Sequence, residues 1–279
     1  MTLSAPLKQG SSAPTRQALL SFFVLVFALA VPFLVLGAVT GRELMPNLPI
    51  ASLMAICPTL AALILSFRAG GGAAASTLIR RSFDARRIKA KAWLAPALLM
   101  APAVGLLNFG VLRLTGTPVP NPEISVLPTL VLCAIFFVGA LGEELGWSGY
   151  AIDPMQERCG ALIASLALGV IWAVFHLVAL RQAHHAAEWI GWWSLGTVAL
   201  RVVLVWLYNN TGSSVFVAAL SHMTFNVVWQ LFPIHGSFMD QRINGLIWAL
   251  AATIVVIVWG PRTLAERWGR NTPQGKHNE

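Results

Sequence analysis

The segment Pro128–Tyr150, "PTLVLCAIFFVGALGEELGWSGY", decides the fold class and raises the question of function. Its first fifteen residues carry no charge, and the next two are the glutamates Glu143 and Glu144. An α-helix rises about 1.5 Å per residue, so a segment of this length crosses most of a hydrocarbon core of about 30 Å. A carboxylate inside a span costs roughly 2.5 kcal/mol or more, and such residues usually face a bundle interior and mark function. The simpler alternative is that the pair only marks the cytoplasmic end of this span.

Apolar segments of similar length recur along nearly the whole chain. Of its 279 residues, 57% are hydrophobic and 11% are charged, whereas a soluble domain has roughly 25% charged residues. We therefore predict an all-α, polytopic membrane protein with about eight transmembrane helices. The predicted spans are 17–39, 48–67, 92–114, 125–147, 160–180, 189–208, 213–232 and 243–260.

These spans divide the chain into regions and predict its orientation. The regions are a tail at 1–16, three spans at 17–124, a core at 125–232, and the last span with a basic tail at 233–279. A basic loop is expected at 68–91, and it includes a flexible stretch, "GGGAAAS". Because Lys and Arg are retained on the cytoplasmic side, we expect this loop and both termini to be cytoplasmic. The net charge of +8 then follows from topology and anionic lipid, and it requires no nucleic acid.

Polar side chains also occur inside the later spans. His176 ends "WAVFH" and His222 begins "HMTFN", so Trp172 with His176, and His222 with Asn226, each share one helical face. A single buried His or Asn is more often a hydrogen-bonding residue of helix packing than a catalyst. Arg201 adds a charge within the sixth span.

The depth of these residues predicts that they converge. If the chain turns back at "RCG", Glu143 lies about sixteen residues before the turn and His176 about sixteen after it. Around the turn at "NNTGSS", Arg201 lies ten residues before Thr211 and His222 eleven after it. Each pair is therefore level across its hairpin, which favours one polar site within the bundle over several unrelated packing contacts.

Such a site has the groups that peptide hydrolysis needs. A carboxylate with an imidazole can deprotonate water and return the proton to a leaving amine, while an imidazole and an amide can stabilise an oxyanion. Glu143, His176 and His222 could instead hold a divalent metal such as zinc, although their spacing is not that of the compact H-E-x-x-H motif. A proton-coupled transporter is a further alternative, which predicts internal repeats that we do not find in the sequence.

The motifs "EELGWSGY", "WAVFH" and "HMTFN", in this order, resemble those of the CPBP intramembrane proteases, also called the CAAX protease and bacteriocin-processing or Abi family. The family pattern is EExxxR, an aromatic residue followed by xxxH, and HxxxN or HxxxD. The resemblance implies that Glu143 activates water beside His176. It also implies that His222 and Asn226 bind the oxyanion, or that His222 helps to hold a metal. Glu144 matches the second acidic position.

The chain departs from the family pattern at one position. The arginine of EExxxR falls at Ser148, so the expected ion pair with Glu144 one turn earlier is absent. We hypothesise that Arg201 neutralises Glu144 in its place; the alternative is that Arg201 extends to the membrane interface. The sequence thus predicts a CPBP-type endopeptidase in a prokaryotic plasma membrane, acting on a membrane-associated protein or peptide. The alternative is an inactive member that binds a membrane partner.

Overall fold

The computed structural model describes residues 16–265, so the predicted tails before and after this range lie outside it almost entirely. The α-helices are α1 (Arg16–Thr40), α2 (Cys57–Arg80), α3 (Leu94–Leu114), α4 (Val126–Gly146), α5 (Ile152–Cys159), α6 (Ala161–Gln182), α7 (Ala187–Asn210), α8 (Val215–Leu231) and α9 (Gln241–Trp259). Short helical turns are η1 (Ile50–Ile56), η2 (Arg81–Phe83), η3 (Ala85–Arg87), η4 (Lys91–Trp93) and the π-turn η5 (Trp147–Ala151). The strands β1 (Glu43–Met45) and β2 (Leu48–Pro49) form a small antiparallel hairpin.

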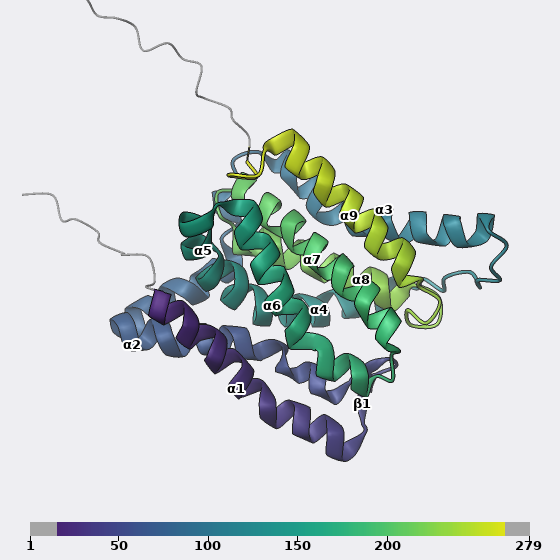
Figure 1. The fold of residues 1–279 in the computed structure, drawn as a ribbon, viewed down its shortest axis with the longest axis horizontal. Coiled ribbons are helices and arrows are strands. Elements are labelled where there is room, and N and C mark those ends of the chain that lie inside the picture. Colours follow the sequence, from purple (N-terminus) through teal and green to yellow (C-terminus); the bar gives the residue numbers. More distant parts are fainter. Residues whose placement is uncertain (1–15, 266–279) are drawn as a thin grey trace, which may run out of the picture.

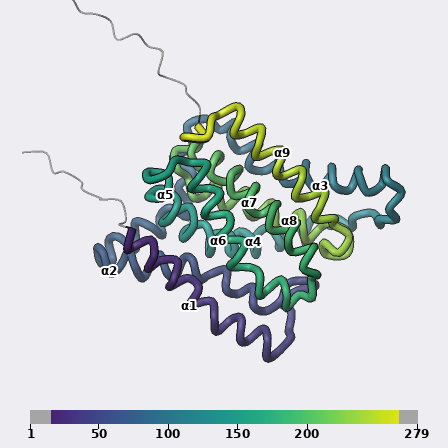
Figure 2. The backbone as a smooth tube through the Cα atoms, viewed as in Figure 1, coloured from purple at the N-terminus to yellow at the C-terminus, as the bar shows by residue number. Residues whose placement is uncertain are grey.

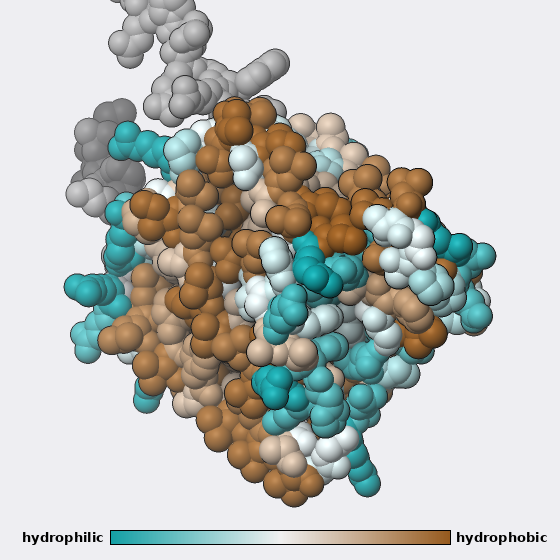
Figure 3. Space-filling view, turned by 45° about the vertical axis from the view of Figure 1, so that its right-hand side comes forward, coloured by the Kyte–Doolittle hydropathy of each residue, from teal (hydrophilic) through white to brown (hydrophobic). Residues whose placement is uncertain are grey.

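The fold class is confirmed as an all-α polytopic membrane protein. Within residues 16–265, seven helical segments are long and apolar enough to cross a membrane. The seventh predicted span, 213–232, corresponds to α8, which is apolar but only 17 residues long. Large apolar side chains are exposed along the outer helices, and Figure 3 shows a broad hydrophobic surface beside a more hydrophilic region. Such a surface is suited to lipid.

The helices pack around α7. In Figures 1 and 2, α1 and α9 lie on opposite flanks of the bundle, with α4, α6, α7 and α8 between them. In α7, 67% of the most apolar 18-residue stretch is buried inside the protein. In the other six candidate spans the corresponding share is at most 44%. Nearly every residue from Ala199 to Tyr208 is inaccessible to solvent or lipid. Arg201, which lies in this stretch, is therefore surrounded by protein.

Glycines let α4 approach α2 and η1 backbone to backbone. A Cβ atom added at Gly142 would lie 2.9 Å from the carbonyl oxygen of Ala55, and one added at Gly146 would lie 2.5 Å from backbone atoms of Pro58. The Thr59 hydroxyl donates a hydrogen bond to the carbonyl oxygen of Leu141 at 3.0 Å. These contacts fix the height and rotation of the helix that carries the glutamate pair.

The structure corrects the predicted loop at 68–91. Helix α2 continues to Arg80, so only the part from Arg81 onward lies outside it. The "GGGAAAS" stretch belongs to this helix and interrupts it only locally, because Gly70 and Gly71 have non-helical backbone angles and Gly71 has a φ of 63°. The alanines that follow have high helix propensity, which explains why the helix resumes after the kink.

The predicted hairpin between the fourth and fifth spans is confirmed. After Gly146 the helix continues through the π-turn η5 and then through α5 to Cys159. Gly160, at φ 78°, reverses the chain, and α6 begins at Ala161. The positive φ favours glycine at this position.

Candidate active site

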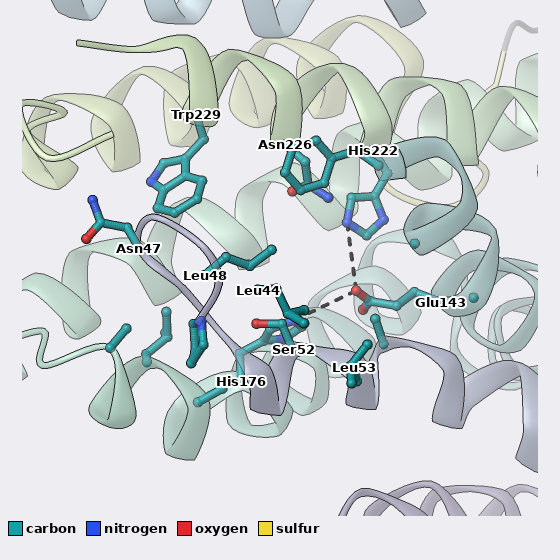
Figure 4. Close-up of a pocket in the computed structure, with 18 of the residues that line it drawn as sticks. Leu44, Asn47, Leu48, Ser52, Leu53, Glu143, His176, His222, Asn226 and Trp229 are labelled. Carbon is teal, nitrogen blue, oxygen red and sulfur yellow. Dashed lines mark ion pairs between the residues drawn. The ribbon is translucent and has the colours of Figure 1, made fainter. Parts of the chain in front are cut away.

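Glu143, His176 and His222 come from three helices and meet at the inner end of a cavity, as Figure 4 shows. The Nε2 atom of His176 lies 3.8 Å from Oε1 of Glu143, and Nε2 of His222 lies 4.0 Å from the same oxygen. The predicted height match of Glu143 and His176 is therefore confirmed. One carboxylate oxygen thus faces two imidazole nitrogens.

The contacts of the two imidazoles indicate which ring nitrogen carries the proton when each ring is neutral. Nδ1 of His176 lies 2.9 Å from the carbonyl oxygen of Trp172, which can only accept, so this nitrogen carries the proton. Nδ1 of His222 lies 3.1 Å from Oε1 of Glu144, and an ionised Glu144 likewise requires the proton on Nδ1. In the neutral imidazoles both Nε2 atoms then present lone pairs. Three acceptors therefore face one another without a donor between them.

Two tryptophans hold the other oxygen of Glu143. The indole nitrogens of Trp147 and Trp172 both donate to Oε2, the first at 3.1 Å. The Glu143 side chain is only 6% exposed, so these bonds replace the water it would otherwise have. They leave Oε1 directed at the cavity. The donor role of Trp147 was not predicted, although its place one turn after Glu143 is a signal that could have suggested it.

Glu144 is fully buried and does not line the cavity. Arg201 donates from Nη1 to its Oε2 at 2.8 Å, and both side chains are 0% exposed. Ser148 donates to the same oxygen, while Oε1 faces Nδ1 of His222. The hypothesis that Arg201 neutralises Glu144 is confirmed. Ser148, which stands at the position of the family's arginine, contributes a hydroxyl, and the positive charge comes from Arg201 of α7.

The side chains do not present a closed metal-ligand set. Two ligands of one tetrahedral zinc ion lie roughly 3.4 Å apart, whereas the imidazole nitrogens lie 3.8 Å and 4.0 Å from Oε1 of Glu143. Across the described part of the chain, no group of three or more His, Cys, Asp or Glu side chains is arranged to hold a metal ion. As placed, the predicted candidates Glu143, His176 and His222 do not fit a metal.

The cavity in front of these residues has a volume of about 630 Å³ and mostly apolar walls. Its aromatic residues include Phe33, Phe136, Trp172, Trp189, Trp193, Phe225 and Trp229. Asn226 lies one turn after His222 on α8 and also lines the cavity, and no hydrogen bond to another residue of the range 16–265 engages its side chain. A polar amide is thus available beside the acceptor cluster.

The β1–β2 hairpin lies at one end of the cavity, where Leu44, Asn47 and Leu48 line it. The Asn47 amide donates to the carbonyl oxygen of His235 at 3.1 Å and to the Ser237 hydroxyl at 2.9 Å, which ties the hairpin to the loop between α8 and α9. The sequence reasoning did not identify the hairpin. Asn47 has a positive φ of 63°, which the short turn requires and which asparagine tolerates better than most residues.

The structure thus brings together all six polar residues singled out from the sequence. Glu143, His176, His222 and Asn226 line the cavity, while Glu144 and Arg201 lie behind it. His185, in the loop between α6 and α7, also lines the cavity, and its ring centre lies 3.6 Å from that of Trp189 in a stacked contact.

Comparisons with known proteins match the same region. Residues 125–228 match the family described as "Type II CAAX prenyl endopeptidase Rce1-like". The chain is also similar to a protein of Methanococcus maripaludis named CAAX prenyl protease 2, with 26% identity over 222 residues, covering 72% of this chain and 78% of the relative. The first match includes all five predicted catalytic residues, Glu143, Glu144, His176, His222 and Asn226. The resemblance to the CPBP intramembrane proteases is confirmed.

Proposed function

We propose that this chain, as a relative of the CPBP intramembrane proteases, hydrolyses a peptide bond of a membrane-associated protein or peptide. The observation that carries the proposal is the cluster of three acceptors, Oε1 of Glu143 and Nε2 of His176 and His222, at the end of an apolar cavity. A water molecule placed among them would donate its protons to acceptors and direct a lone pair outward. This is the arrangement that a general base uses to activate water.

In the proposed reaction, Glu143 takes a proton from water as the water oxygen bonds to the substrate carbonyl carbon. The second O–H of the water donates to the Nε2 lone pair of one of the two imidazoles, which holds the water in place. Glu143 then returns the proton to the amide nitrogen, the C–N bond breaks, and the products are an amine and a carboxylic acid, which releases its remaining proton to solvent or to the amine. The chain's own residues supply each proton transfer, so the reaction balances without a further reactant.

We assign the oxyanion to Asn226. Neutral His222 carries no proton on Nε2, so it orients water and does not donate to the oxyanion, which differs from one of the roles that the family resemblance implies. The Asn226 amide is a donor on the adjacent turn of α8 and lines the cavity. Removing one such donor typically lowers kcat by about 10²–10³-fold.

The cavity wall suggests the class of substrate. Among the described residues that line it, Glu143 is the only acidic or basic one apart from histidines, and most of the others are apolar or aromatic. An uncharged, apolar segment beside the cleaved bond would therefore fit. The relative's name refers to a prenyl protease, and a prenylated peptide is one form that such a segment could take.

The alternative of an inactive family member rested on Ser148. Arg201 places a buried cation beside Glu144, and this supports an active enzyme although Ser148 stands at the position of the motif arginine. We further propose a prokaryotic plasma membrane with both termini in the cytoplasm. Under this orientation the hairpin end of the cavity is extracytoplasmic.

The proposal is tested with purified protein reconstituted in liposomes and quenched fluorescent peptides that carry an apolar segment, with and without a prenyl group. Glu143→Gln keeps the size and the indole hydrogen bonds of the side chain but removes the base. We expect cleavage by the parent and loss of at least about 10²-fold in kcat for the variant. Glu123→Gln, in an exposed loop, is the matched control. Equal turnover of parent and Glu143→Gln would exclude Glu143 as the base.

A further inference from the structure

We infer that Arg201 is a positioning residue, and that in this chain the cation of the catalytic motif has moved from α4 to α7. Its role is to keep Glu144 ionised so that Glu144 fixes the orientation and tautomer of His222. The inference rests on the proposed function and identifies a further residue on which that reaction depends.

The two oxygens of Glu144 have separate partners. Oε2 accepts hydrogen bonds from Arg201, at 2.8 Å, and from Ser148. Oε1 lies 3.1 Å from Nδ1 of His222. Arg201 therefore holds one side of the carboxylate while the other side remains available to the imidazole.

The charge of Glu144 determines what it can do to His222. An ionised carboxylate can only accept, so Nδ1 of His222 keeps its proton and Nε2 presents a lone pair toward Glu143. A protonated Glu144 could donate to Nδ1 and place the proton on Nε2. That tautomer would direct an N–H at the position where water must be held. A cation beside Glu144 is therefore needed for the water site and not only for folding.

The packing around Arg201 explains how a residue of α7 can replace one of α4. Ser148 is small and only 1% exposed, so it leaves room beside Glu144. Gly169 lets α6 and α7 approach closely, because a Cβ atom there would lie 3.0 Å from Cα of Val198 and 3.2 Å from Cβ of Arg201. The guanidinium carbon lies 4.1 Å from the centre of the Trp172 ring, a favourable cation–π contact.

Arg201 acts through other residues, because neither it nor Glu144 lines the cavity. Loss of the cation should therefore lower kcat and leave KM almost unchanged. A mutation that only loosened the fold would instead lower the fraction of active protein.

The test moves the positive charge from Arg201 on α7 back to position 148, where the family has its arginine. Arg201→Ala removes it, Ser148→Arg introduces one at the motif position, and the double variant S148R/R201A exchanges the two sites. We expect Arg201→Ala to lower kcat by about 10²-fold with KM changed by less than about threefold. Ser148→Arg alone should also be impaired, because two guanidinium groups would compete for one buried carboxylate. The double variant should recover kcat to within about tenfold of the parent.

A second variant separates positioning from folding. E144Q/R201M replaces the buried ion pair by a neutral pair, which often preserves stability. We expect its thermal unfolding temperature to stay near that of the parent while its kcat falls as in Arg201→Ala. Parent-like kcat in either Arg201→Ala or E144Q/R201M, or a well-folded S148R/R201A no faster than Arg201→Ala, would overturn the inference.

Failure of the proposed function gives a different result. If the parent cleaves no peptide, the protease proposal fails. The role of Arg201 is then judged by the unfolding temperatures alone, and S148R/R201A must be more stable than Arg201→Ala. If it is not, the relocation of the cation is refuted independently.

Discussion

Replacing Gly146 by alanine should displace the helix that carries the glutamate pair. The new Cβ atom would lie 2.5 Å from the backbone carbon and oxygen of Pro58, and neither atom can rotate away as a flexible side chain could. Helices α2 and α4 must therefore separate by about 0.5–1 Å. Overpacking of this kind typically costs about 1–3 kcal/mol.

The displacement has two measurable effects. For a chain of this size, each kcal/mol corresponds to about 2–4 °C in Tm, so we expect Tm to fall by about 2–12 °C in detergent. Glu143 lies three residues before Gly146 and would move with the helix. A shift of about 1 Å in a catalytic group can lower turnover by about 10²-fold.

Gly139→Ala provides the matched control for stability in the same helix; because Gly139 lines the cavity, turnover is compared with that of the parent. A Cβ atom there meets no atom within 4 Å, so alanine should be tolerated and should even favour the helix. Both variants are followed by thermal unfolding and by peptide cleavage in liposomes. If Gly146→Ala matched Gly139→Ala in thermal unfolding and the parent in cleavage, the close contact of α4 with α2 would not determine the geometry of the site.

Three further predictions follow from other contacts. Asp84 accepts from the Ser214 hydroxyl at 2.7 Å and from the Phe216 amide at 3.2 Å at the start of α8, so Asp84→Ala should cost about 1 kcal/mol and lower turnover. Asp240→Ala, which removes the equivalent bonds of α9, should destabilise similarly without lowering turnover, and equal losses of turnover would contradict this. Prolonged dialysis against a chelator should leave cleavage unchanged, because the ligand candidates are too far apart; a loss that zinc restores would show that they rearrange around a metal. With Cys133 and Cys159 replaced by serine, a membrane-impermeant maleimide should label Glu43→Cys in intact cells and Arg87→Cys only after permeabilisation, and the reverse pattern would refute the proposed orientation.

Much of the architecture was predictable, because a bilayer imposes a length on every crossing helix. All eight predicted spans correspond to helices, and the turn at Gly160 is where the change from polar to apolar residues places it. The height match of Glu143 and His176 followed from residue counting, since the rise per residue is constant. Arg201 was identifiable because a lone charge inside a span requires a partner.

The remaining features depend on rotations between helices, which residue spacing does not determine. The donation from Trp172 to Glu143 needs α6 to turn its indole toward α4. The hairpin contacts of Asn47 join residues almost 190 positions apart. The continuation of α2 was missed for a local reason, because three consecutive glycines normally indicate a loop and here cause only a kink.

The burial of Arg201 in α7 also has a consequence for how the protein is made. Of the seven candidate spans, α7 is the least apolar and the most buried, and an arginine at the centre of a span costs roughly 2.5–3.5 kcal/mol during insertion. Helix α4 has an insertion cost of its own, because it contains the carboxylates of Glu143 and Glu144. It leaves the ribosome before α7. The charges of the two helices are tolerated in lipid only after the ion pair between Glu144 and Arg201 has formed. We expect α4 to remain near the insertion machinery until α7 emerges, so the ion pair at the site also sets an order of assembly.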